Sequence, residues 1–180
     1  MNNKLIKVTT GFARFFEVMC WIGEAGMWVF LLAVLFGGDT VSNALAQGFD
    51  DGSITITGFN INVIAADGSL IKGALIMAIV FGIVSMVMAA MICRNIRLIF
   101  MKETPFCEDN IRMVREIGIF SIAIPVVGLI LSVIAGLVFG QDTTEVNVDT
   151  INIFFGLVVL SLSQFFKYGA QLENEVDGLV

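Results

Sequence analysis

Residues 15–36 read FFEVMCWIGEAGMWVFLLAVLF, and this stretch decides what kind of protein the chain is. A bilayer core about 30 Å thick is crossed by about 20 apolar residues in a helix. The stretch is long enough for one crossing, and its only charged side chains are those of Glu17 and Glu24. It therefore predicts a membrane-spanning helix.

Three more apolar runs of similar character follow at residues 70–93, 117–140 and 151–166. The chain is 57% hydrophobic and 14% charged, whereas soluble domains are about 25% charged. We predict an all-α membrane protein, a bundle of four transmembrane helices forming one domain over residues 1–180. The runs leave an outer loop at 37–69, a cytoplasmic loop at 94–116 and a cytoplasmic amphipathic tail at 167–180. The second and third helices are expected to continue to Ile99 and back to Glu108.

Basic residues predict the orientation, because Lys and Arg in short loops stay in the cytoplasm. Nine of the ten fall on the side of the two termini and the central loop: Lys4, Lys7, Arg14, Arg94, Arg97, Lys102, Arg112, Arg115 and Lys167. We expect a multi-pass protein of the bacterial inner membrane with both termini cytoplasmic. The competing interpretation is a cleaved signal peptide, with Lys4 and Lys7 in its n-region and a cleavage site at residues 44–46. The length of the apolar run and the glutamates within it argue against this interpretation.

The outer loop changes period in the segment GSITITGFNINVIAADGSL. Ile54 and Ile56 alternate with threonines, and Phe59, Ile61 and Val63 alternate with asparagines after Gly58. This alternation predicts strands with a bulge or bend at the glycine. The second outer loop offers a similar stretch, TEVNVDT. We expect a small extracytoplasmic β-hairpin or three-stranded layer that caps the helix ends.

Small residues recur at helical spacing in two of the spans. The second span carries Ala78, Gly82, Ser85 and Ala89, and the third carries Gly128, Ser132, Gly136 and Gly140. Such spacing favours close helix packing in membranes. Both stripes are interpreted as packing surfaces.

Glu24 is the anomaly of the first span, since it lies near the bilayer centre. An ionised carboxylate there is costly, so we expect a neutral acid that faces protein and is hydrogen-bonded to a hydroxyl or amide. Glu17 lies in the interface, within reach of Arg14, Arg115 or Lys167. The predicted intramembrane polar cluster consists of Glu24, Trp21, Ser85, Ser161 and Gln164. Two roles remain open for this cluster. It could fix the alignment of the helices in the bundle, or it could bind a ligand or a proton.

Two cytoplasmic stretches, KETPFCEDNIRMVREIG and FFKYGAQLENEVDGLV, carry the most specific motifs. Acidic and amide groups at residues 108–110 are typical of a helix N-terminus. The motif residues are Pro105, Phe106, Asn110, Arg112, Lys167, Gly169, Glu173 and Asp177. Together they resemble the bacterial membrane protein family known as domain of unknown function 2975. Cys107 and Asp109 depart from the serine and glutamate typical of that family.

The resemblance covers essentially the whole chain and implies four helices, a strand-bearing outer loop and an acidic cytoplasmic end. It also implies a regulatory or interaction protein that senses or sequesters a helix-turn-helix transcription regulator. The surface for that contact would comprise Arg94, Arg97, Lys102, Phe106, Asn110, Arg112 and the tail at residues 173–177. Anionic lipid head groups are the alternative ligands of these arginines.

A small proton-coupled or cation transporter that uses Glu24 is the alternative function. We expect no enzyme activity, because the chain has no histidine and no pairing of nucleophile and base. No cofactor and no metal are expected, and the three cysteines are interpreted as free thiols. The expected partners are membrane lipids, the regulator and a homo-oligomer, without direct binding of nucleic acid.

Overall fold

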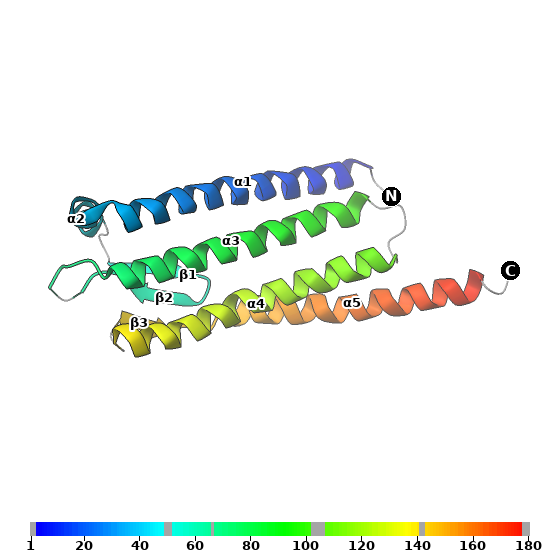
Figure 1. Ribbon diagram of the computed structural model, residues 1–180. Helices are drawn as coiled ribbons and strands as arrows, with labels where there is room; N and C mark the ends of the chain where they lie inside the picture. Colours follow the sequence, from blue (N-terminus) through cyan, green and yellow to red (C-terminus); the bar gives the residue numbers. More distant parts are fainter. Residues whose placement is uncertain (1–2, 49–51, 66, 102–106, 141–142, 178–180) are drawn as a thin grey trace. The chain divides into compact units, whose positions relative to one another are not determined.

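The computed structural model describes residues 3–48, 52–65, 67–101, 107–140 and 143–177. Its four long helices are α1 (Asn3–Phe36), α3 (Lys72–Met101), α4 (Glu108–Phe139) and α5 (Thr150–Asp177) (Figure 1). Each contains a segment long and apolar enough to cross a membrane, as in multi-pass membrane proteins. A short helix and three strands complete the structure: α2 (Gly38–Gly48), β1 (Ser53–Ile56), β2 (Phe59–Asn62) and β3 (Thr144–Val146). Four apolar helices with a small antiparallel sheet are confirmed.

The helix boundaries extend the predicted spans toward one end. Helix α1 begins at Asn3 rather than at residue 15, and α4 begins at Glu108, as expected. The strands expected in the outer loop are present, but a helix that was not predicted, α2, occupies the first part of that loop. Val41 and Leu45 lie one helical turn apart in α2, and Leu45 packs on the hydrophobic core. This spacing is the signal that could have predicted α2.

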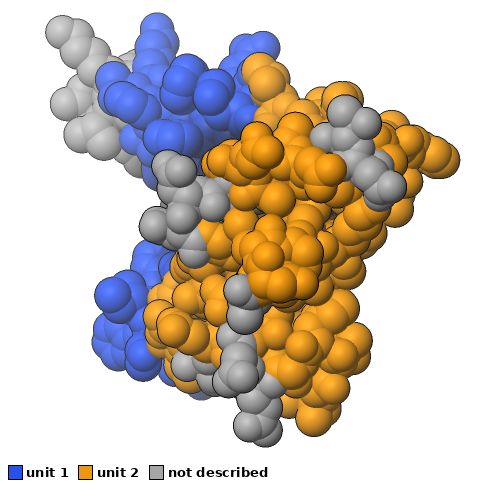
Figure 2. All heavy atoms as spheres, turned by 90° about the vertical axis from the view of Figure 1, so that its left-hand side faces the viewer, with its two compact units in different colours: residues 1–21, 88–123, 150–180 blue, residues 22–87, 124–149 orange. Residues whose placement is uncertain are grey.

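The chain divides into two compact units (Figure 2). Unit 1 comprises residues 1–21, 88–123 and 150–180, so it contains segments of α1, α3 and α4 together with all of α5. Unit 2 comprises residues 22–87 and 124–149, and it contains the other segments of α1, α3 and α4 with α2 and the sheet. Unit 1 is thus built from four helix segments, whereas unit 2 combines three segments of the long helices with α2 and the sheet.

The sheet of unit 2 is antiparallel with the strand order β1-β2-β3. Ile56 pairs with Phe59, so Thr57 and Gly58 form a two-residue hairpin turn. Both have positive φ, 33° for Thr57 and 82° for Gly58, as the turns favoured in two-residue hairpins require. The bend predicted at Gly58 is therefore a chain reversal. The bulge considered in its place is wrong, because the pairing continues without an extra residue.

The apolar side of β2 forms the centre of the hydrophobic core. Phe59, Ile61 and Val63 are fully buried, and Phe59 meets Phe81 of α3 edge-on, with ring centroids 5.2 Å apart. Burying a side chain of this size is worth about 1.5–3 kcal/mol. The alternation read from the sequence thus identifies the strand around which unit 2 packs.

The hairpin does not cap the helix ends as predicted, but lies between α3 and α4 (Figure 1). A Cβ added to Gly128 of α4 would lie 3.3 Å from the Thr57 carbonyl oxygen, and one added to Gly82 of α3 would lie 3.4 Å from Ile56. Gly128 is eleven residues before the end of α4, a distance of about 16 Å along a helix. The small-residue stripes therefore admit the hairpin between the helices.

Candidate functional site

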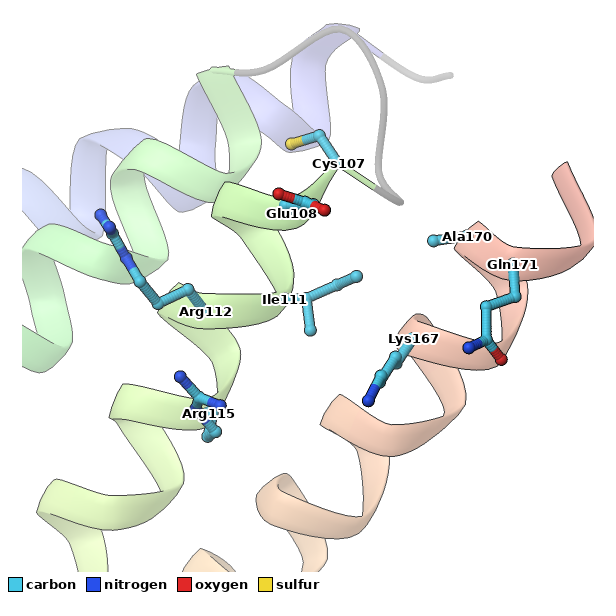
Figure 3. Close-up of a pocket in the computed structure, with 8 residues that line it drawn as sticks. All are labelled: Cys107, Glu108, Ile111, Arg112, Arg115, Lys167, Ala170 and Gln171. Carbon is cyan, nitrogen blue, oxygen red and sulfur yellow. The ribbon is translucent and has the colours of Figure 1, made fainter. Parts of the chain in front are cut away.

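Unit 1 contains a cavity of about 550 Å³ between the first turns of α4 and the end of α5 (Figure 3). Arg112 and Arg115 line it from α4, and Lys167 lines it from α5. Ile111 of α4 points toward α5 across the cavity (Figure 3). The remaining lining residues are Cys107, Glu108, Ala170 and Gln171. The volume falls within the range of about 300–1,000 Å³ that ligand sites occupy.

Two glycines bring α4 and α5 together next to this cavity. A Cβ added to Gly118 would lie 3.0 Å from the Gly156 carbonyl oxygen, and one added to Gly156 would lie 2.9 Å from the Gly118 carbonyl oxygen. The backbones are thus in direct contact, a packing that larger residues would prevent. This contact holds α4 and α5 together about one helical turn from Arg115.

Acidic side chains neutralise part of the positive charge at this end of unit 1. Glu17 of α1 accepts two hydrogen bonds from Arg97 of α3, from Nε at 3.0 Å and from Nη2 at 3.3 Å. Glu116 accepts a hydrogen bond from Asn95 Nδ2 at 2.9 Å and pairs with Arg112 Nε at 3.5 Å. The sequence predicted a basic partner for Glu17, but the partner is Arg97 and not Arg14, Arg115 or Lys167.

Arg115 and Lys167 keep their charge available to the cavity. Within the described part of the chain, neither side chain forms an ion pair. The cavity also borders the start of α4, where the backbone N–H groups carry a partial positive charge. Among the described residues that line the cavity, Glu108 is the only acidic one. The arrangement therefore suits an anionic group better than a cation.

The structure brings together only part of the predicted cytoplasmic motif. Arg112 and Lys167 line the cavity, whereas Gly169 and Glu173 belong to α5 but not to the lining, and Asp177 is the last residue of that helix. Pro105 and Phe106 lie outside the described residues, as does Lys102 of the expected contact surface.

Two residues of the expected contact surface are not accessible in the predicted way. Asn110 is 2% exposed, so it packs inside unit 1 and does not present its amide to a partner. Arg97 is held by Glu17 and its side chain is 29% exposed. The prediction that Asn110 lies on the contact surface is wrong, because that residue is buried, whereas Arg97 is paired with Glu17 but remains partly exposed.

Sequence reasoning missed Arg115 and Gln171 as lining residues. Glu108, Ile111, Arg112 and Arg115 follow one another at helical spacing, and Lys167 and Gln171 are four residues apart on α5. Residues at this spacing share one helix face. That periodicity was the available signal in the sequence. It does not show that this face of α4 and this face of α5 lie opposite each other.

The region around Glu24 lies in unit 2, where α1 and α3 pack closely. A Cβ added to Gly23 would meet the sulfur of Met86, and one added to Gly82 would meet Met27. Since α1 and α3 are antiparallel, this register places Glu24 level with Ser85. The Oε2 atom of Glu24 and the Oγ atom of Ser85 are buried, and neither has a hydrogen-bond partner in the described part of the chain.

The polar cluster predicted around Glu24 is thus only partly present. Glu24 turns inward as expected, but the expected hydrogen bond to a companion is missing. Trp21 is 49% exposed, and Ser161 and Gln164 are exposed side chains of α5. Ser161 donates its hydroxyl to the Leu157 carbonyl of its own helix at 2.9 Å. The prediction that these three are buried with Glu24 is wrong.

The described residues contain no group of three or more Cys, Asp and Glu side chains that could hold a metal ion. Comparison of the chain with protein-family models, with curated proteins and with solved structures finds no match. The resemblance to domain of unknown function 2975 therefore stays a prediction.

Proposed function

We propose that the chain is a multi-pass protein of the bacterial inner membrane that regulates a soluble cytoplasmic partner by binding an acidic segment of it. The cavity between α4 and α5 is the proposed binding site, and the observation that carries the proposal is the joint presence there of Arg112, Arg115 and Lys167. The resemblance inferred from the sequence supports a helix-turn-helix transcription regulator as the partner.

The charge distribution supports this assignment. The described basic residues other than Lys72 all belong to unit 1, and the positive-inside rule assigns such an end to the cytoplasm. Opposite charges on two proteins raise the rate of their encounter and favour one orientation. An acidic segment would neutralise Arg115 and Lys167, which no carboxylate of the described chain does.

The test measures binding of the regulator that co-purifies with the chain, after that regulator has itself been purified. Replacing Arg115 and Lys167 by alanine is expected to weaken its binding at least about tenfold, which corresponds to about 1.4 kcal/mol. The matched control replaces Lys7 and Arg14, two exposed cations of α1 outside the cavity. Both double variants remove two charges, so only the cavity pair should weaken binding.

Two results would contradict the proposal. One is equal binding by the cavity and control variants, since a nonspecific charge effect then accounts for the association. The other is a cavity variant that retains the regulator but loses bound anionic phospholipid, which would identify the cavity as a lipid site. Truncation after Gly169 should also abolish binding, because it removes Ala170 and Gln171 from the lining.

Glu24, a partly buried residue whose Oε2 atom faces inward, supports proton or cation transport as a second candidate function. Its Oε2 atom has no hydrogen-bond partner in the described residues, although it is shielded from solvent. A buried carboxylate without a partner is costly, and such groups in membrane spans often mark ion pathways. Flux into liposomes tests this function: Glu24→Gln should abolish it, and flux that persists at the same rate excludes the transport role of Glu24.

A further inference from the structure

The sheet of unit 2 has a polar side opposite its buried side. Thr55, Asn60 and Glu145 stand next to one another across the three strands, because Thr55 pairs with Asn60 and Asn60 pairs with Glu145. Asn60 Nδ2 donates a hydrogen bond to Glu145 Oε2 at 3.2 Å. Thr55 and Glu145 are exposed, so nothing in the described chain covers the two outer members of this polar row, whereas Asn60 between them is partly buried.

The polar row lies beside helix segments that present apolar side chains outward. The turn of the hairpin reaches Gly128, eleven residues before the end of α4, and Ile56 reaches Gly82, ten residues after the start of α3. Over the same part of α4, the exposed side chains are Ile130, Val133, Ile134, Leu137 and Val138. A span that ends at the outer boundary thus places the turn about 16 Å deep, near the middle of the bilayer core. The polar row lies between the turn and that boundary, since Thr144, next to Glu145, lies 3.0 Å from a Cβ added to Gly136, three residues before the end of α4.

Hydrocarbon does not tolerate such a surface. Strand edges and polar side chains at membrane depth occur only where protein covers them or where they line a water-filled cavity. Unit 2 supplies the wall behind the sheet, because Phe59 and Ile61 are fully buried against the helices. The wall in front of Thr55 and Glu145 has to come from another molecule, since both are exposed.

We propose that the polar row Thr55–Asn60–Glu145 packs against the same row of a second copy of the chain within the membrane. The proposal rests on the membrane insertion in the proposed function. The exposed side chains of the row are chemically complementary to each other: the Thr55 hydroxyl can donate a hydrogen bond, and the Glu145 carboxylate can accept one. In a twofold contact each copy presents the same patch to the other, so donors of one row face acceptors of its partner.

Thr55 and Glu145 give a specific reason for a protein partner. Both side chains are exposed. At membrane depth a polar group without a partner costs about 1–3 kcal/mol. A donor from the second copy would satisfy the Glu145 carboxylate and an acceptor would satisfy the Thr55 hydroxyl, whereas lipid chains offer neither.

Cross-linking in native membranes tests the contact. Cys20, Cys93 and Cys107 are replaced by alanine, and a single cysteine is introduced by Thr55→Cys or, as the control, by Val133→Cys. Val133 is 50% exposed on α4 and lies five residues beyond Gly128, so it occupies a similar depth. A short bifunctional maleimide should link most of the Thr55→Cys chains into dimers and leave the Val133→Cys chains monomeric.

The outcomes separate the alternatives. Labelling of Thr55→Cys by a membrane-impermeant maleimide without cross-linking would mean an open aqueous vestibule and overturn the proposal. Cross-linking to a protein of another mass would overturn it too, as would equal cross-linking of Thr55→Cys and Val133→Cys. Light scattering in detergent should give the mass of two chains. A chain that alkaline carbonate extracts from membranes would instead refute the membrane insertion, whatever the cross-linking shows.

Discussion

Glu17 and Arg97 form a two-point ion pair between α1 and α3, with N···O distances of 3.0 and 3.3 Å and side-chain exposures of 14% and 29%. Glu17→Met leaves a partly buried guanidinium without its partner, which we expect to cost about 2 kcal/mol of unfolding free energy. The double variant Glu17→Met/Arg97→Met should be more stable than Glu17→Met alone. Denaturant unfolding in detergent measures both. Additive losses in the double variant would contradict the pairing.

The contact between Gly118 and Gly156 predicts that α4 and α5 cannot accommodate a methyl group there. Gly118→Ala and Gly156→Ala are each expected to destabilise the protein by about 1–3 kcal/mol, because the added Cβ lies within 3.0 Å of a carbonyl oxygen. Gly11→Ala and Gly26→Ala are the controls, since a Cβ at either position meets nothing within 4 Å. These should be neutral or stabilising by up to about 1 kcal/mol. Thermal unfolding in detergent measures the difference, and equal effects at all four positions would refute the close contact.

The backbone conformation of Thr57 predicts that a substitution at this position of the hairpin turn would stabilise the protein. A β-branched residue is strained at its φ of 33°, whereas Asn followed by Gly is favoured in such turns. Thr57→Asn should therefore raise the unfolding free energy by about 0.5–1 kcal/mol. Thr55→Asn is the control, because Thr55 lies in β1, where Asn has low propensity. A loss of stability in Thr57→Asn would contradict the proposed turn geometry.

The hydrogen bonds of Asp67, which lies outside the helices, predict a small pH dependence of the unfolding free energy. Hydrogen bonds from the Ser69 hydroxyl and backbone N–H, at 2.6 and 2.9 Å, lower the pKa of Asp67 below its usual value of 3.8. A carboxyl with a lowered folded-state pKa stabilises the fold above the unfolded-state pKa, and this contribution is lost as the pH falls through the folded-state pKa. Ser69→Ala should raise the pKa of Asp67 toward its usual value in a ¹³C NMR titration. An unchanged value would exclude the hydroxyl as the cause.

Much of the architecture follows from local patterns in the sequence. The apolar runs predicted the four long helices, and alternation at Phe59, Ile61 and Val63 predicted the central strand. These features depend on the polarity of each side chain and of neighbours a few residues away. The grouping of Arg112 and Lys167 in one site was anticipated in part, since both belonged to the predicted cytoplasmic motif.

Other features depend on which residues meet across long stretches of chain. Glu17 finds Arg97, eighty positions away, and Glu24 is level with Ser85 but makes no hydrogen bond to it. The small-residue stripe of α4 admits the hairpin at Gly128, and the backbone of α4 contacts that of α5 at Gly118. Composition and periodicity do not encode these pairings. The sequence by itself determined which segments form helices and strands, because local side-chain chemistry decides that. Only the tertiary structure decided the register between these segments, and hence which charges are paired and which line the cavity.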